Sequence, residues 1–212
     1  MYENIVTAEL LEYIQNKVFP VYNLNGKAHD INHIRTVLER AFEISGPYKS
    51  NLNFDMLYTA VAYHDIGDHI DRENHEKVSA KWMIEDEKLK QFFNDEQREE
   101  IRQAIEDHRS SKGGVPRNLY GKILASADKN VDVDVFMKRS YEYGLEHYKE
   151  LNQEQQIQRV YEHAINKFGK GGYAVDKYYV EDKKYFEYLN ELQRLIDNKD
   201  EFFDRCKRAI EL

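Results

Sequence analysis

Histidine and aspartate side chains stand at the ends of apolar rows in four separate segments of this sequence. His33 lies at the edge of one row, His64 and Asp65 end the next, and His108 and Asp128 each close a further one. An inward histidine alone is more often an ordinary core residue, and an inward aspartate alone is more often a cap or an ion-pair partner. Together, imidazoles and carboxylates from separate helices are the ligands that a divalent cation takes in a helical bundle. The set therefore predicts a metal site.

Hydrophobic periodicity predicts the helices that must position these side chains. No segment alternates as a strand would, so the expected fold is all-α. Asp30 is an expected N-cap, and Asn94 with Gln97 forms an expected capping box. The predicted helices lie at about 5–18, from 30 to 46, through the segment 57–71, at 74–86, from 95 to 108, from 119 onward, at 133–148, at 153–168, and from about 176 to 212 with an interruption near Asn198. Residues expected to face inward include Ile5 in the first helix and Val78 and Trp82 in the fourth.

Length and composition set the broad class of the protein. The chain has 212 residues and no Pro/Ser-rich linker, which predicts one domain over 1–212 with a core at about 21–140 and C-terminal helices at 141–212. A net charge of −8 without a basic block argues against binding to a nucleic-acid polymer or an anionic membrane. One cysteine, Cys206, fits a reducing compartment, and neither a signal peptide nor a membrane span is evident. A cytoplasmic location is expected.

The order and spacing of the candidate ligands resemble those of a known family. The stretch from Asp30 through His33 to Val37 resembles the D-x-x-H-x-x-x-V opening of the HD-domain superfamily of metal-dependent phosphohydrolases. The His64-Asp65 doublet and the segment ILASADKN resemble the doublet and the closing aspartate of that superfamily. The resemblance spans residues 29–130 and is closest to small stand-alone bacterial HD proteins, which carry an extra histidine before the last aspartate. It implies a phosphodiesterase-like helical bundle with a C-terminal helical extension.

The resemblance also implies a ligand set and a metal. The ligands carried over are His33, His64, Asp65 and Asp128. They would hold Mn, Fe, Co, Zn or Mg, and mixed imidazole and carboxylate ligation suits the transition ions better than Mg. In binuclear members, extra histidines bind a second ion with the doublet aspartate bridging. His75 and His108 are therefore assigned either to a second metal or to substrate phosphate and acid catalysis.

Several further residues have expected roles around the metal. A metal-activated water would attack phosphorus, and Asp68, one turn past His64, would accept its proton or orient a ligand, unless it is merely an exposed carboxylate. Candidate phosphate-binding cations are Arg35, Arg109, Lys112 and Lys129. Of the remaining histidines, His29 is assigned to the loop or to the surroundings of the ligands. The other three, His69, His147 and His163, are assigned to solvated faces.

The substrate class stays broad. Ile66-Gly67-Asp68 follows the doublet in place of the acidic pair of the guanosine-tetraphosphate hydrolases, and the double-histidine and GYP elements of the cyclic-di-GMP phosphodiesterases are missing. The expected substrate is a small phosphate ester, with nucleotides among the candidates. Two alternatives remain open: an HD-fold di-iron oxygenase that uses a six-ligand set, and a non-catalytic metal-binding helical module. The tyrosine-rich last third would either cover the pocket or form a homodimer.

Overall fold

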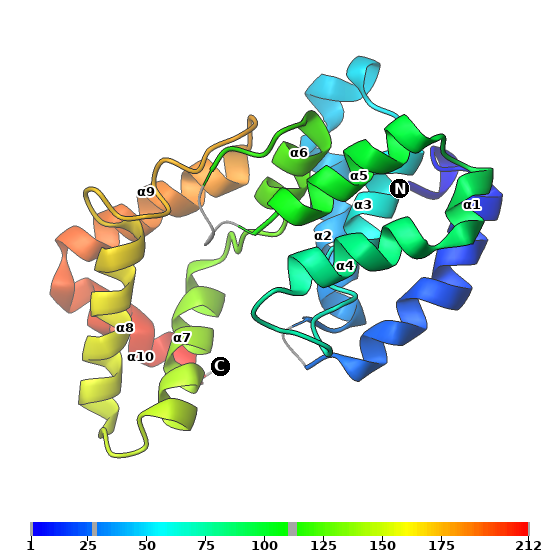
Figure 1. Cartoon of the computed structure of the whole chain (residues 1–212). Coiled ribbons are helices and arrows are strands. Elements are labelled where there is room, and N and C mark those ends of the chain that lie inside the picture. Colours follow the sequence, from blue (N-terminus) through cyan, green and yellow to red (C-terminus); the bar gives the residue numbers. More distant parts are fainter. Residues whose placement is uncertain (1, 27–28, 110–113, 212) are drawn as a thin grey trace. The chain divides into compact units, whose positions relative to one another are not determined.

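The computed structural model describes residues 2–26, 29–109 and 114–211, and their regular structure consists of helices without a strand (Figure 1). The expected all-α fold is thus confirmed. Packing divides the chain into two compact units, Met1–Asp128 with Tyr179–Glu181 and Lys129–Tyr178 with Asp182–Leu212. The single domain over 1–212, with its core at about 21–140 and C-terminal helices at 141–212, stays a prediction, and the boundary between the compact units lies at residue 128. Each unit is described by itself.

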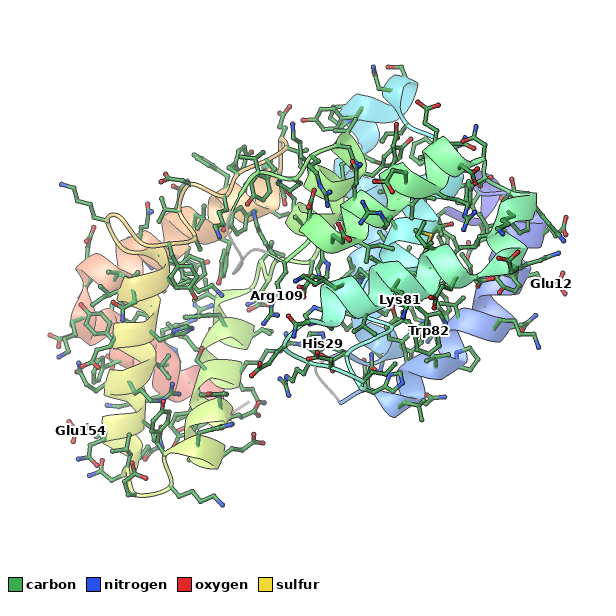
Figure 2. The ribbon with its side chains drawn as sticks, viewed as in Figure 1. Glu12, His29, Lys81, Trp82, Arg109 and Glu154 are labelled. Carbon is green, nitrogen blue, oxygen red and sulfur yellow. The ribbon has the colours of Figure 1, made fainter. Side chains whose placement is uncertain are left out.

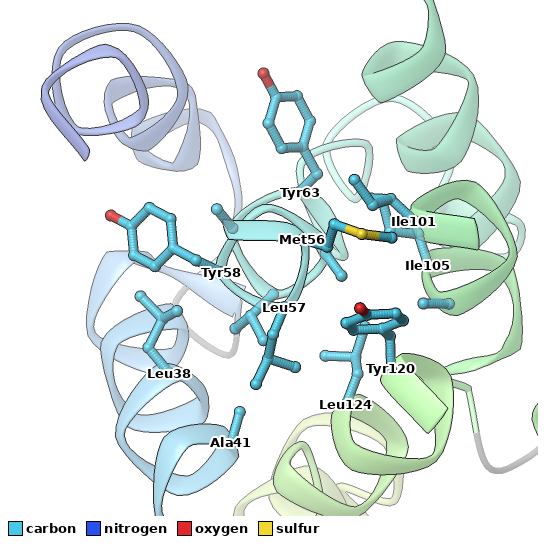
Figure 3. Packing of buried hydrophobic residues seen from close by; sticks show 14 of the residues in the cluster. Leu38, Ala41, Met56, Leu57, Tyr58, Tyr63, Ile101, Ile105, Tyr120 and Leu124 are labelled. Atoms are coloured by element: carbon cyan, nitrogen blue, oxygen red, sulfur yellow. The ribbon is translucent and has the colours of Figure 1, made fainter. Parts of the chain in front are cut away.

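Unit 1 is built around one helix that is buried on all sides. Its elements are η1 (Tyr2–Asn4), α1 (Ala8–Tyr13), η2 (Ile14–Val18), η3 (Phe19–Leu24), α2 (Ile31–Ile44), η5 (Gly46–Asn51), α3 (Phe54–Tyr63), α4 (His75–Glu85), η6 (Glu87–Gln91), α5 (Asp95–Asp107) and α6 (Leu119–Ala127). Every residue of α3 from Met56 to Tyr63 is buried. Figure 3 shows α3 between Leu38 of α2, Ile105 of α5 and Leu124 of α6. A helix that is apolar all round forms the centre of such a unit.

Helix caps fix where these helices begin. The Asp30 side chain accepts hydrogen bonds from the backbone N–H groups of Asn32 and His33, which starts α2 and sets His33 in its first turn. Asn94 and Gln97 form the expected capping box of α5. Both predicted caps are confirmed, and each satisfies backbone donors that a helix start leaves open.

The inward faces differ from expectation in two helices. Ile5 is 52% exposed, and the neighbouring Val6 is buried in its place. In α4 the predicted Val78 and Trp82 are only half-buried, because the face turned to the core is a different one. The buried residues of α4 are His75, Glu76, Ser79, Ala80 and Met83. Polar side chains therefore occupy the start of this face, and apolar periodicity alone could not identify it.

A short segment far along the chain completes the core of unit 1. Val180 is buried within this core, and the backbone N–H of Glu181 donates to the hydroxyl of Tyr48 at 3.1 Å. The hydroxyl of Tyr179 donates to the carbonyl of Gly114 at 3.3 Å. Unit 1 is therefore assembled from two stretches of chain that are separated by about fifty residues of unit 2.

Unit 2 contains the remaining helices around a core of its own. These are α7 (Val133–His147), α8 (Gln153–Phe168), α9 (Lys183–Asp197) and α10 (Lys199–Glu211), and α9 and α10 are separated at Asn198 as the sequence predicts. Phe202 and Cys206 are fully buried in this core, and Tyr185 and Tyr188 are nearly so. Among the residues that the structure describes, every helix is too short or too polar to traverse a lipid bilayer.

Candidate metal centre

The His64-Asp65 doublet lies in a series of tight turns that follows α3. The sequence predicts helix through this segment, but α3 ends at Tyr63, and residues 64–70 form turns. The backbone N–H of Ile66 donates to Tyr63, and that of Asp68 donates to Asp65, each three residues back. In such three-residue spacing, side chains at i and i+3 lie above one another. Asp65 and Asp68 accordingly line the same cavity.

Three histidine rings are each held by a hydrogen bond from Nδ1 to a backbone carbonyl oxygen. The Nδ1 atoms of His64, His75 and His108 lie 2.7, 3.0 and 2.6 Å from the carbonyl oxygens of residues 61, 72 and 105. A carbonyl oxygen only accepts, so each Nδ1 carries the hydrogen and donates it. In a neutral ring, Nε2 then presents a lone pair. A backbone acceptor on one ring nitrogen is the usual support of a histidine that binds metal through the other.

The first group of ligand atoms combines α2, the turns after α3 and the end of α6. His33 Nε2 lies 3.4 Å from Asp65 Oδ2 and 3.1 Å from Asp128 Oδ1. His64 Nε2 lies 3.2 and 3.8 Å from the same two oxygens. Ligand atoms of His33, His64 and Asp128 all lie within 4.8 Å of one another. The four ligands taken from the family resemblance are thus brought together.

The second group of candidate ligand atoms lies beside Oδ1, the other carboxylate oxygen of Asp65. His75 Nε2 is 3.2 Å and His108 Nε2 is 3.4 Å from Asp65 Oδ1, and the two nitrogens are 3.3 Å apart. Neutral rings with hydrogen on Nδ1 would point two lone pairs at each other, which a shared cation would resolve. Asp65 is 1% exposed and offers one oxygen to each group.

Buried polar atoms without a hydrogen-bond partner mark the same place. Among the described residues, these atoms include Nε2 of His33, Nε2 of His64, Oδ1 of Asp65 and Oδ1 of Asp68. Leaving a buried polar atom unpaired costs about 1–3 kcal/mol, so several together demand a partner. A divalent cation bound by these nitrogens and oxygens would provide one. The donor set therefore fits a metal ion.

The pKa values of these groups reflect their mutual contacts. Burial alone would lower the pKa of His33, but the nearby carboxylates of Asp128 and Asp65 outweigh it and raise the pKa to about 9. Burial also opposes protonation of His64, yet the Asp65 charge raises its pKa well above the usual value. Against its own burial, Asp65 is held well below its usual pKa by the imidazoles around it. Protons therefore occupy this cluster when no cation does, and metal binding must displace them.

His29 lies closer to the cluster than sequence analysis suggested. Its Nδ1 is 2.6 Å from Asp65 Oδ2, and its Nε2 is 4.0 Å from Asp68 Oδ1. Asn25 fixes this arrangement, because its amide donates to the carbonyls of both His29 and Asp65. His29 precedes the extended N-cap Asp30 and lies outside α2, so helical periodicity gave no signal for this position.

Two arginines line the cavity beside the ligands. The cavity has a volume of about 240 Å³ and is lined by His29, Asp65, Asp68, Arg72, His75, His108, Arg109 and Asp128. Figure 2 shows Arg109 and His29 at the same end of unit 1. The Arg109 guanidinium donates to the carbonyl of Glu73 and lies 3.6 Å from the carboxylate of the buried Glu76. Arg109 was a predicted phosphate contact, whereas sequence analysis missed Arg72.

The other predicted cations lie elsewhere. Arg35 lines a different pocket, near Tyr2, because two residues beyond His33 is more than half a turn around α2. Lys129 belongs to unit 2, where its ammonium donates to the carbonyl of Lys177 and lies over the Tyr185 ring. Lys112 is outside the described residues.

The three histidines assigned to solvated faces differ in exposure. His147 is exposed, as expected, and stacks on Tyr143. His69 and His163 are half-buried instead. His69 packs edge-on to Trp82, and its backbone N–H donates to the Asn25 side chain. Packing against aromatic neighbours, rather than solvation, therefore determines where these two rings lie.

Gly67, two residues after the His64-Asp65 doublet, packs so closely against α4 that no side chain would fit. A Cβ atom there would lie 2.7 and 2.8 Å from Val78 side-chain atoms, and the Gly67 N–H donates to Ser79 Oγ at 2.9 Å. We expect Gly67→Ala to lower the free energy of unfolding by about 1–3 kcal/mol, because α4 must move away. Gly46→Ala, where a Cβ meets nothing within 4 Å, is the matched control. Thermal unfolding of both variants measures the difference, and equal melting temperatures would contradict this prediction.

Comparison with known proteins finds a family that this chain resembles. Residues 30–130, just under half of the chain, match the HD domain family, and this segment contains every member of the two ligand groups. No curated protein sequence matches the chain. A crystal structure of a predicted HD superfamily hydrolase from an uncultured Thermotogales bacterium is similar at 24% identity and a TM-score of 0.47, over 73% of this chain and 83% of that one. The likeness to the HD domain family therefore depends on this match over residues 30–130.

Proposed function

We propose that this protein is a metal-dependent phosphohydrolase that acts on a small phosphate ester. The HD domain and the ligand cluster support a metal-dependent hydrolase in general. The observation that carries the proposal furthest is the Asp65 carboxylate, which presents Oδ2 to one group of ligands and Oδ1 to another. A bound divalent ion would supply a water of lowered pKa and polarise a phosphoryl oxygen.

The two ligand groups can hold one ion each. His33, His64, Asp128 and Oδ2 of Asp65 would hold the first. His75, His108 and Oδ1 of Asp65 would hold the second. Because imidazole and carboxylate ligands are mixed in both groups, Mn, Fe, Co or Zn suits the site better than Mg.

The remaining residues of the cavity supply proton transfer and positive charge. Asp68 is buried, and its Oδ1 lacks a hydrogen-bond partner among the described residues, so this atom can take up a proton during hydrolysis. His29 holds Asp65 by a hydrogen bond on the side facing Asp68. Arg72 and Arg109 would pair with the phosphate oxygens, for which a planar guanidinium is well suited.

Phosphate release with and without metal tests the proposal. Purified protein would be assayed on p-nitrophenyl phosphate and on a panel of nucleotides, then treated with chelator and resupplied with single metals. We expect activity to disappear on chelation and to return with a transition ion. Activity that persists in chelated, metal-free protein would contradict a metal-dependent hydrolysis.

A di-iron oxygenase is the second candidate. The position of both His75 and His108 beside Asp65 Oδ1 favours it, because these two histidines complete a six-ligand set with His33, His64, Asp65 and Asp128. Iron content and oxygen consumption distinguish the two functions. An oxygenase would consume oxygen with an organic substrate and release no phosphate. A phosphohydrolase would release phosphate and consume no oxygen.

A further inference from the structure

A second cavity lies entirely within unit 2, between α7 and α8, which are neighbours in Figure 1. Its volume is about 530 Å³, within the range of roughly 300–1,000 Å³ that is usual for small-molecule sites. Its lining consists of Asn130, Phe136, Arg139, Ser140, Tyr143, Tyr148, Arg159, His163 and Lys167. None of these residues lines the cavity at the candidate metal centre, which is called the HD-domain cavity below.

The lining of this cavity is positively charged although the chain is acidic. The protein has 39 acidic and 31 basic residues, yet this lining includes Arg139, Arg159 and Lys167 and no aspartate or glutamate. Arg159 donates hydrogen bonds to two neutral acceptors, the carbonyl of Ser140 and the side-chain oxygen of Gln156. Positive charge gathered in a concave site attracts anions.

Aromatic rings lie beside these cations. The guanidinium carbon of Arg159 is 5.8 Å from the centre of the Tyr143 ring and 5.4 Å from that of Tyr148. The two tyrosines are 51% and 41% exposed, so ring surface is accessible at the cavity. His147 already stacks on Tyr143, and the exposed ring surface that remains beside arginine can stack on a planar group of a ligand.

The pKa of His163 is a second indication that the electrostatic potential in this cavity is positive. This half-buried ring stacks on Phe136 with centres 5.6 Å apart. Its pKa is lowered by burial and further by the charges of Lys167 and Arg159. Cations that suppress protonation of a neighbour would equally stabilise a bound anion.

We propose that the cavity between α7 and α8 binds a phosphorylated small molecule with a planar ring, of the nucleoside monophosphate class. Arg139, Arg159 and Lys167 would contact the phosphate, since guanidinium groups pair with two phosphate oxygens at once. Tyr143 and Tyr148 would stack on the base. This ligand site does not depend on the metal centre or on the proposed hydrolysis.

Calorimetric titration of the full chain with adenosine monophosphate tests the proposal. The titration uses chelated protein carrying Asp65→Asn, so that the HD-domain cavity lacks its metal and the key ligand. We expect binding to persist in this background and to weaken about tenfold or more in Arg139→Ala and in Tyr143→Ala, as is typical for the loss of a charged phosphate contact or of one stacking ring. Lys149→Ala, an exposed lysine of unit 2 outside the cavity lining, is the matched control and should bind normally.

Each alternative outcome overturns the proposal. If inorganic phosphate bound as tightly as the nucleotide, stacking of the base would contribute nothing to binding. If adenosine bound as tightly, the basic residues would contribute nothing. Absence of nucleotide binding in the Asp65→Asn background, with binding in the unaltered protein, would place the nucleotide at the HD domain alone. Equal affinity of Arg139→Ala, Tyr143→Ala and Lys149→Ala would show that this cavity is not the site. Circular dichroism of each variant verifies that its helices are intact.

Discussion

Asp65→Asn is expected to remove both of the proposed metal ions and to lower kcat/KM by roughly a thousandfold, which corresponds to ~4 kcal/mol of transition-state stabilisation. Asp65 is the residue that both ligand groups share, and histidines 33, 64, 75 and 108 all lie within 3.4 Å of its two oxygens. An amide keeps the shape but loses the negative charge and one acceptor oxygen, so it can neither bridge nor neutralise two cations. Metal analysis of the purified variant, together with phosphate release, measures the effect.

A matched carboxylate in the same unit provides the control. The side chain of Asp55 accepts hydrogen bonds from the backbone N–H and the hydroxyl of Thr7 and contacts none of the ligands. Asp55→Asn should therefore retain full metal content and activity. If Asp65→Asn retained two ions per chain, the shared carboxylate would not be a ligand, and the proposed arrangement would be wrong.

His108→Ala is expected to halve the metal content of a protein that holds two ions, and to lower kcat/KM by roughly ten- to a thousandfold. His108 and His75 are the proposed ligands beside Asp65 Oδ1, while the proposed ligands beside Oδ2 stay in place. Loss of one imidazole from a small ligand set typically leaves too few bonds to retain the ion. Metal stoichiometry by elemental analysis is the primary measurement, and His75→Ala should give the same result.

Two comparisons make this second test specific. His147→Ala removes an exposed imidazole of unit 2 and should leave both ions in place. An unchanged stoichiometry in His108→Ala would exclude His108 as a ligand and would favour a substrate or proton-transfer role. Simultaneous loss of both ions would show that the two sites fill as one.

Much of the fold follows from local sequence signals. Asp30 and Asn94 satisfy the first backbone N–H groups of their helices within three residues, so the starts of α2 and α5 are visible in the sequence. The break at Asn198 and the bounds of α7 and α8 also lie within about one residue of expectation. Local hydrogen bonding and periodicity determine all of these features.

The parts that escaped prediction depend on contacts distant in sequence. The turns after Tyr63 replace the expected helix where Gly67 packs against Val78 and Ser79 of α4. Arg72 reaches the cavity from these connecting turns, where no periodicity applies. Arg35 is adjacent to a ligand in sequence but lies on another face of α2, so sequence proximity alone was a poor guide.

The Tyr179–Glu181 segment has a consequence for how this protein emerges from the ribosome. Unit 1 buries Val180, which is synthesised only after α7 and α8. During translation, the last core residue of unit 1 therefore becomes available only after these two helices have been synthesised. A chaperone that shields apolar surface would find this unit incomplete for longer than its 128 leading residues suggest.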